Sequence, residues 1–394
     1  MNNFSKGGIP LKDARVAVIG VGTMGSMAMW QLARKGITSV IGFEQFYLGH
    51  DRSAAGGESR AFRTAYLEGS KYVPLLMDSR QQWRELEQDT NTDLLTLNGG
   101  LMIGNEQHES IKTILECVRT YDLDHEIIGP AQAKVYYPQH PLNDGEVMIL
   151  DKQAGFIRPE RSVLTAARRA EELGATILRK ATVQNIIPHS NGVTVMVDDR
   201  AYEFEKVIVT AGPWLDKLLP ALKDNFEVNR LLLTWFTSEK INQFLPERFP
   251  IFVRFSEEIN LFGVPSLDCS MVKIAPVSDR GDGPVINPNS MDRNVPLQDI
   301  EKLIQGVKSC LPDLIPESVR VAAYMDGYTP DHAPLVGFLP GNENIIVMGG
   351  FSGHGFKFAP LMGRIASELV LTGETHYDID FMDPARFLKE KSSL

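Results

Sequence analysis

The chain has 394 residues, of which 43% are hydrophobic and 23% are charged, and its formal net charge is −10. This length favours two domains, and the composition is typical of a soluble globular protein with a large core. The acidity is spread along the chain without a basic tract, which argues against a nucleic-acid partner. No apolar run approaches the ~20 residues of a membrane helix, which argues against a membrane protein.

The cysteines and the first residues indicate the compartment. The three cysteines are Cys117, Cys269 and Cys310, and no pair has the spacing of a metal site. Free thiols fit a reducing compartment, and we expect no metal. The opening stretch MNNFSKGGIPLKDA lacks the apolar core of a signal peptide. We therefore expect a cytoplasmic protein.

The first predicted elements form a strand, a helix and a second strand. A β-branched run at 15–19 predicts a buried strand, a helix is expected over 27–35 with Gly36 after it, and a second strand ends at Glu44. Between the first strand and the helix lie Gly20, Gly22 and Gly25, at the spacing GxGxxG. An acid about 20 residues beyond these glycines completes a dinucleotide-binding pattern.

Each residue of this pattern has a distinct chemical task. Gly20 permits a tight turn, Gly22 lets the backbone approach a pyrophosphate, and Gly25 lets the helix pack close to the strand. Glu44 can accept hydrogen bonds from ribose hydroxyls and would repel a 2′-phosphate, which disfavours NADP. The pattern leaves NAD and FAD open, and an ordinary glycine-containing turn is the alternative to both.

The rest of the chain alternates between nucleotide-type segments and a different, sheet-rich segment. Helices are expected within 72–87, 159–174 and 297–314; strands and turns at 99–104, 175–199 with a hairpin at Asn191–Gly192, 205–214, 230–238, 250–256 and 271–277; and a strand, glycine turn and helix over 344–373. Nucleotide-type segments therefore occur near the start, the middle and the end. This order predicts a discontinuous dinucleotide domain with an inserted substrate domain.

Several motifs together resemble one known family. They are the glycine fingerprint with Glu44, GGESRAFRTAYLEGSKYVP at 56–74, VIVTAGPW at 207–214, FGVPSLDCSMVKI at 262–274, YTPDHAPLVG at 328–337 and GFSGHGFKFAP at 350–360. Over nearly its whole length the chain resembles the monomeric sarcosine oxidase and N-methyltryptophan oxidase family, within the D-amino-acid-oxidase-like flavoproteins. The late motifs favour FAD over NAD, because FAD enzymes often add contacts from a mid-chain strand and a C-terminal glycine turn.

The resemblance implies an α/β fold and a domain division. It implies a Rossmann-like FAD-binding domain of the glutathione-reductase type, with an inserted antiparallel-sheet substrate domain. We assign 12–92, 149–219 and 325–394 to the FAD-binding domain, and 93–148 and 220–324 to the substrate domain. The family name also implies a monomer.

The resemblance further implies a reaction and its residues. Hydride passes from the carbon next to the substrate nitrogen to flavin N5, O2 becomes H2O2, and the imine product is hydrolysed. Arg63 and Lys357 correspond to the pair that binds the substrate carboxylate. Arg60 lies beside the flavin, Lys273 assists oxygen activation, and His354 lies near both flavin and substrate. The alternative for each cation is a solvated surface group. Lys357 fits this alternative least, because a cation at the start of a helix opposes the helix dipole.

The resemblance also predicts which residues contact the cofactor. They are Gly20, Gly22, Thr23, Met24, Gly25, Glu44, Ser59, Arg60, Val183, Ala211, Gly212, Gly350, Gly353, His354, Gly355 and Lys357.

The sequence departs from the family around the substrate. Tyr324 occupies the position where many members attach FAD through a cysteine, so we predict non-covalent FAD. Asp326 and Phe262 replace pocket tyrosines, and Val277 replaces a histidine. These changes place sarcosine itself in doubt. Asp326 suggests a cationic amine substrate, and the alternative is that it faces solvent or hydrogen-bonds a strand end.

The leading hypothesis is an FAD-dependent oxidase of a secondary amine or amino acid. The alternatives are an amine dehydrogenase with another electron acceptor, a natural-product amine or imine oxidase on the same scaffold, and a non-catalytic nucleotide-sensing module.

Overall fold

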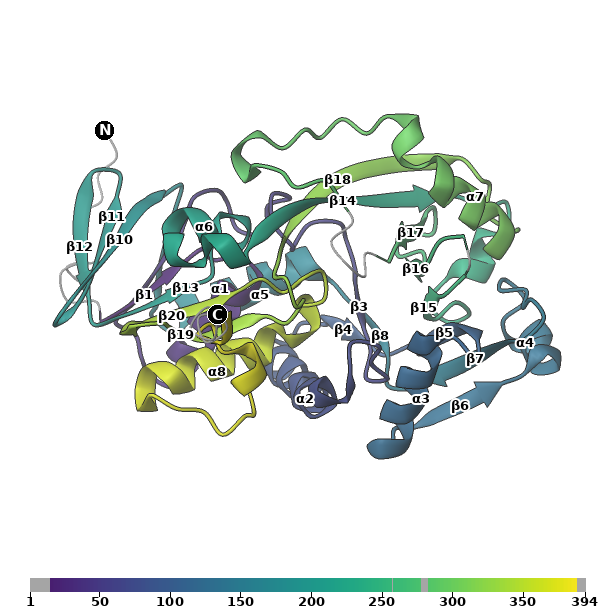
Figure 1. Cartoon of the computed structure of the whole chain (residues 1–394), viewed down its shortest axis with the longest axis horizontal. Coiled ribbons are helices and arrows are strands. Elements are labelled where there is room, and N and C mark those ends of the chain that lie inside the picture. The colour runs from purple at the N-terminus through teal and green to yellow at the C-terminus, as the bar shows by residue number, and fades with distance from the viewer. Residues whose placement is uncertain (1–14, 257, 278–282, 388–394) are drawn as a thin grey trace, which may run out of the picture.

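A computed structural model describes residues 15–256, 258–277 and 283–387. Within these residues, the strands form two large sheets and two three-stranded sheets. Figure 1 shows the two large sheets side by side, with strands β14 (Glu227–Phe236) and β18 (Ser318–Tyr328) reaching across the top.

The first large sheet is mostly parallel and carries the glycine fingerprint. Its six strands have the order β19-β20-β13-β1-β2-β9, and only β19 runs antiparallel to its neighbour. They are β19 (Leu335–Leu339), β20 (Asn342–Gly349), β13 (Lys206–Val209), β1 (Val16–Ile19), β2 (Val40–Glu44) and β9 (Thr176–Arg179). The central strand β1 is fully buried, as expected of an apolar run covered on both faces.

The helices of this half pack on one another through small residues. Helix α1 (Thr23–Arg34) packs against α5 (Pro159–Glu172) and α8 (Ala359–Thr372), and α8 also packs against α2 (Val73–Thr90). A methyl group on Gly363 would lie 2.5 Å from the Met27 carbonyl carbon, so this glycine permits the close contact of α1 with α8. This contact joins the fingerprint to the C-terminal glycine turn, although they are far apart in the sequence.

The second large sheet belongs to the other half of the molecule. Its strand order is β18-β14-β17-β16-β15-β5-β7-β6, antiparallel except where β15 pairs with β5. Besides β14 and β18, its strands are β17 (Val272–Pro276), β16 (Leu261–Val264), β15 (Ile251–Arg254), β5 (Gly100–Asn105), β7 (Glu146–Asp151) and β6 (His125–Ile128). The helices of this half are α3 (Glu109–Thr120), α4 (Pro130–Tyr136) and α7 (Glu301–Cys310).

Two small sheets complete the fold. One contains β3 (Arg60–Phe62), β8 (Gly155–Ile157) and β4 (Leu95–Thr96); the other contains β10 (Val183–His189), β11 (Gly192–Val197) and β12 (Arg200–Phe204), and a short helix α6 (Leu215–Leu218) follows β13. The hairpin predicted at Asn191–Gly192 is present, because β10 pairs antiparallel with β11 in a register that places His189 opposite Gly192.

The structure differs from the sequence expectations in two respects. First, α3 and α4 occupy a segment for which we expected only a strand at 99–104. Second, the first helix begins at Thr23 rather than Met27, directly after the N-cap residue Gly22. In the described residues, no helix is both long and apolar enough to cross a bilayer.

Candidate active site

A cavity of about 440 Å³ opens at the carboxyl ends of the parallel strands. In open α/β sheets, ligands bind in this crevice. The predicted cofactor residues that line it are Gly20, Gly22, Thr23, Met24, Glu44, Arg60, Val183, Ala211, Gly212, Gly350, Gly353 and Gly355. Gly25, Ser59, His354 and Lys357 were predicted as contacts but do not line this cavity.

The fingerprint glycines differ in what surrounds them. Gly20 adopts a φ of +86°, and a methyl group on Gly25 would lie 1.9 Å from the Gly20 oxygen. Gly22 instead has no atom within 4 Å of the position of a methyl group, and it lines the cavity. The hydroxyl oxygen of Thr23 is buried without a hydrogen-bond partner. The start of α1 therefore offers open space and unused donors, which suits a phosphate at a helix N-terminus.

This contrast gives a stability prediction. We expect Gly25→Ala to lower the free energy of unfolding by about 1–3 kcal/mol, because the added methyl group overlaps the backbone. Gly22→Ala should cost less than about 1 kcal/mol but should weaken FAD binding, because its methyl group projects into the cavity. Urea unfolding of the flavin-free protein and flavin titration separate the two effects. Equal unfolding midpoints for both variants would contradict the close packing at Gly25.

Glu44 lies at the end of β2 and is only 3% exposed. Its carboxylate accepts the backbone N–H groups of Val21 and Phe46 at 3.0 and 2.9 Å, and His50 Nε2 lies 3.4 Å away. These contacts fix the carboxylate in the cavity wall. It is available there to a ribose hydroxyl, as the pattern predicts.

A second cavity of about 230 Å³ adjoins the first. Both cavities are lined by Ala54, Arg60, Asp326, Gly353 and Phe356. Every residue predicted to be catalytic or to bind the substrate lines the second cavity, namely Arg60, Arg63, Phe262, Lys273, Asp326, His354 and Lys357. The structure thus brings together side chains from distant parts of the sequence.

Arg63 is a buried cation with spare hydrogen-bonding capacity. Its side chain is 9% exposed, and Nη2 donates to the Glu68 carboxylate at 3.3 Å. The Nε and Nη1 groups of Arg63, and one oxygen of Glu68, have no partner. Burial raises the pKa of Glu68, but Arg63, His354 and Lys357 together hold it below its usual value. Buried donors of this kind are costly unless a ligand satisfies them.

Lys357 lies in the turn before α8 and belongs to an ordered hydrogen-bond chain. Burial lowers the pKa of His354 to about 4, so its ring is neutral near pH 7. Its Nε2 lies 3.1 Å from the His332 carbonyl oxygen, which can only accept, so Nε2 carries the proton. The Tyr66 hydroxyl then donates to His354 Nδ1 at 2.8 Å, and Lys357 Nζ donates to Tyr66 at 3.1 Å.

The hydrogen bonds of Lys357 leave one of its N–H groups free of protein partners. Nζ also donates to the His354 carbonyl at 2.7 Å, so two of the three ammonium donors are occupied. Burial lowers the pKa of Lys357 to about 7. The remaining donor lies in the same cavity as Arg63.

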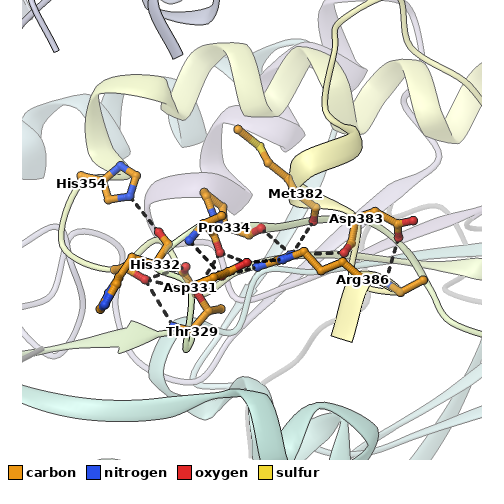
Figure 2. A network of polar contacts seen from close by, with 12 residues as sticks. Thr329, Asp331, His332, Pro334, His354, Met382, Asp383 and Arg386 are labelled. Atoms are coloured by element: carbon orange, nitrogen blue, oxygen red, sulfur yellow. Dashed lines mark hydrogen bonds and ion pairs between the residues drawn. The ribbon is translucent and has the colours of Figure 1, made fainter. Parts of the chain in front are cut away.

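The loop that carries His332 is fastened by the C-terminal segment. Figure 2 shows Arg386 bound to Asp331, while the His332 carbonyl faces His354. Arg386 also donates to the Ala333 and Pro334 carbonyls at 2.7 and 3.1 Å. His332 has a left-handed φ of +58°, and its Nδ1 is buried without a partner.

Lys273 lies on β17 and is 2% exposed. Its ammonium group donates to the carbonyls of Gly57 and Ser59 at 3.0 and 2.5 Å and to the Ser59 hydroxyl at 3.1 Å. Burial and the nearby Arg60 hold the pKa of Lys273 well below its usual range. A cation held in a buried site interacts more strongly with developing negative charge than it would in water.

Arg60 and Asp326 lie between the two cavities. Arg60 donates to the carbonyls of Ala54, Gly56 and Ser59 at 2.5–2.7 Å. The two carboxylate oxygens of Asp326 accept the backbone N–H groups of Gly327 and Gly353, at 2.8 and 3.0 Å. Burial raises the pKa of Asp326 despite these bonds. Asp326 therefore ties β18 to the glycine turn.

A large part of the lining of the second cavity is apolar. It contains Leu231, Leu232, Leu233, Val253, Phe262, Pro276, Val277 and Met325, together with Tyr324. Tyr324 packs against the loop before Arg60, since a methyl group on Gly56 would lie 2.4 Å from its ring. Tyr324, Phe262 and Val277, three of the positions predicted to differ from the family, belong to this apolar lining, whereas Asp326 lies between the two cavities.

Three residues of this site were not predicted individually, namely Tyr66, Glu68 and His332. Tyr66 and Glu68 follow Arg63 closely in the motif at 56–74. Two polar side chains so soon after a predicted substrate-binding arginine could have indicated that they belong to the site. His332 also lies in a quoted motif, YTPDHAPLVG, but nothing in that motif indicates its contact with His354, because its place depends on a loop held by distant residues.

Comparisons with known proteins show the family and the fold of this chain. The model of the family "FAD dependent oxidoreductase" matches residues 15–369. The chain is 33% identical over 375 residues to a monomeric sarcosine oxidase of Streptomyces avermitilis, covering 94% of this chain and 97% of the relative. It is 28% identical to an N-methyl-L-tryptophan oxidase of Yersinia pestis, covering 95% and 100%. The crystal structure of NikD, an unusual amino acid oxidase of nikkomycin biosynthesis, shares the fold with a TM-score of 0.81 and 22% identity, covering 94% and 96%.

Proposed function

The chain belongs to the FAD-dependent oxidoreductase family, and on that premise we propose that it is an FAD-dependent oxidase of a secondary amino acid. An amine oxidoreductase of this family needs a cofactor cavity, an adjoining substrate cavity and a group that binds the substrate. The two adjoining cavities and the buried cations that line the second one support this proposal.

The larger cavity fits FAD. The open space at Gly22, the unpartnered Thr23 hydroxyl and the start of α1 suit the pyrophosphate, and Glu44 suits the ribose. When bound, FAD would supply the hydride acceptor and the reductant of O2. The protein's own residues would bind and orient the substrate and provide fixed charges.

The observation that carries the proposal is the pair Arg63 and Lys357. Both line the second cavity, and Arg63 has two donors without partners while Lys357 has one free of protein partners. A substrate carboxylate supplies the acceptors that these donors lack, and an arginine fork can bind it through two hydrogen bonds. The apolar part of the lining of the same cavity favours a substrate with a sizeable apolar part. We also propose that the protein is a monomer.

A peroxide assay tests this function and the role of Asp326 together. Purified protein is supplied with N-methyl, cyclic, cationic and neutral amino acids, both as wild type and as Asp326→Ala. We expect peroxide from apolar secondary amino acids. If Asp326 selects cationic substrates, only those should lose turnover in Asp326→Ala. Equal losses for all substrates would indicate that Asp326 acts through its bonds to Gly327 and Gly353, and no peroxide from any amino acid would contradict the oxidase.

Acid denaturation tests how the flavin is attached. Tyr324 offers no thiol for a covalent link, and none of the three cysteines lines either cavity. We therefore expect all the yellow flavin to appear in the supernatant after acid precipitation. Flavin absorbance that stays with the pellet would contradict non-covalent binding.

A further inference from the structure

One row of side chains crosses the eight-stranded sheet next to the site. Trp235 on β14 lies directly opposite Lys273 on β17, and on its other side directly opposite Arg320 on β18. Residues that pair in this way project from the same face of a sheet. The guanidinium carbon of Arg320 lies 4.1 Å from the Trp235 ring centre, and Trp235 is fully buried.

The turn formed by Gly57, Glu58 and Ser59 lies against this row. The Glu58 carboxylate accepts the Trp235 indole N–H at 2.9 Å, and Arg320 Nη1 lies 3.6 Å from the same oxygen. The carbonyls on either side, those of Gly57 and Ser59, accept the Lys273 ammonium group. One turn therefore contacts all three members of the row.

Glu58 adopts an uncommon backbone conformation. Its φ is +74°, a left-handed value that costs a non-glycine residue about 1–3 kcal/mol unless its surroundings hold it. Its backbone N–H donates to Glu160 at 2.9 Å, and Glu160 lies in the first turn of α5. Two contacts thus hold the turn in place. The Glu58 side chain binds Trp235 and Arg320 of the sheet, and the Glu58 backbone N–H binds Glu160 of α5.

We propose that Glu58 is a positioning residue that anchors the 57–59 turn on Trp235 and Arg320, and thereby holds the Lys273 ammonium group in the substrate cavity. This inference deepens the proposed function, because it takes Lys273 as the cation that assists oxygen reduction. It assigns a task to a residue that touches neither cavity.

The charges around Lys273 predict a pH effect. Burial lowers the pKa of Lys273 most, Arg60 and Arg320 lower it further, and Glu58 and Glu160 oppose them. The ammonium form of a lysine is lost as pH rises through its pKa. Removing the Glu58 charge lowers that pKa, so the cation should be lost at a lower pH.

The kinetic test separates the two half-reactions. In Glu58→Ala, we expect the anaerobic reduction by substrate to change less than about twofold, whereas reoxidation by O2 slows about tenfold. Glu58→Gln keeps an acceptor for Trp235 but carries no charge, so it should recover part of the reoxidation rate. The fall of this rate with rising pH should occur at a lower pH in Glu58→Gln than in the wild type. Glu317→Gln, an exposed acid near the start of β18, is the control. Equal slowing of both half-reactions, or wild-type reoxidation in Glu58→Ala, would overturn the proposal.

A second measurement uses the flavin-free protein. The indole N–H resonance of Trp235, assigned from Trp235→Phe, should shift in Glu58→Ala and return towards its wild-type position in Glu58→Gln. The Lys273 side-chain resonance, assigned from Lys273→Met, should change in parallel. If Lys273→Met reoxidises normally, the function proposed for Lys273 fails, and these resonances still decide whether Glu58 holds the turn. Unchanged resonances in Glu58→Ala would overturn the anchoring itself.

Discussion

Replacement of Lys273 with methionine is expected to slow the reoxidation of the reduced enzyme by O2 about 10²–10³-fold. Reduction of O2 builds up negative charge, and Lys273 is the buried cation that the carbonyls of Gly57 and Ser59 hold in the substrate cavity. Methionine keeps an unbranched side chain of similar length but carries no charge, so it removes the electrostatic effect with little change in packing. The anaerobic reduction by substrate should change far less, because the carboxylate contacts remain.

Stopped-flow mixing of the reduced enzyme with buffer of known O2 concentration measures this rate directly. Lys240→Met is the matched control, because Lys240 follows the same sheet's β14 but its side chain is 57% exposed. Wild-type reoxidation in Lys273→Met would remove Lys273 from the reaction. Slow reoxidation of the wild type itself would favour a dehydrogenase that passes electrons to another acceptor.

The dinucleotide fingerprint could be predicted because it is local. The spacing of Gly20, Gly22 and Gly25 and the distance to Glu44 are set by one strand, one turn and one helix, so the sequence pattern alone indicates the geometry. Helix α3 was also within reach. Its buried residues Ile111, Ile114, Cys117 and Val118 follow a helical period, which by itself indicates a helix in this segment.

The substrate cavity depends on contacts that no local pattern contains. Arg63 and Lys357 could be paired only through the resemblance, because they come from opposite ends of the chain and meet where the glycine turn joins the first half. The proton order from Lys357 through Tyr66 to His354 depends on the His332 carbonyl. A loop fastened by Arg386 holds that carbonyl in place. Such relations depend on tertiary contacts, so they became visible only in the structure.

Removal of the carboxylate contacts is expected to have the second large effect. Arg63→Met should lower kcat/KM for an amino acid about 10²–10³-fold, since truncating one partner of a buried charge pair costs about 2–5 kcal/mol. Arg63→Lys should recover only part of the activity, because an ammonium group lacks the planar fork of the guanidinium group. The double variant of Arg63 and Lys357 should lose less than the sum of the single losses, because both side chains would contact one carboxylate.

The matched control for this prediction changes the substrate and not a second residue. The carboxamide of the same amino acid lacks the negative charge, so its kcat/KM should be low in the wild type and nearly unchanged in Arg63→Met. Arg63→Met also leaves the Glu68 carboxylate without its partner, and the carboxamide reports any loss that arises from that change alone. An equal fall for acid and carboxamide would assign Arg63 to the packing of the cavity and not to carboxylate binding.

The same pair predicts the pH dependence of substrate binding. Burial lowers the pKa of Lys357 to about 7, so in the free enzyme its ammonium form is lost as pH rises through that value. Binding of the carboxylate should therefore weaken above about pH 7, and kcat/KM, which reports the free enzyme, should show this fall. Lys357→Met has no group to titrate there, so its profile should lack this fall while Arg63→Lys retains it. A fall that persists unchanged in Lys357→Met would assign the titration to another group.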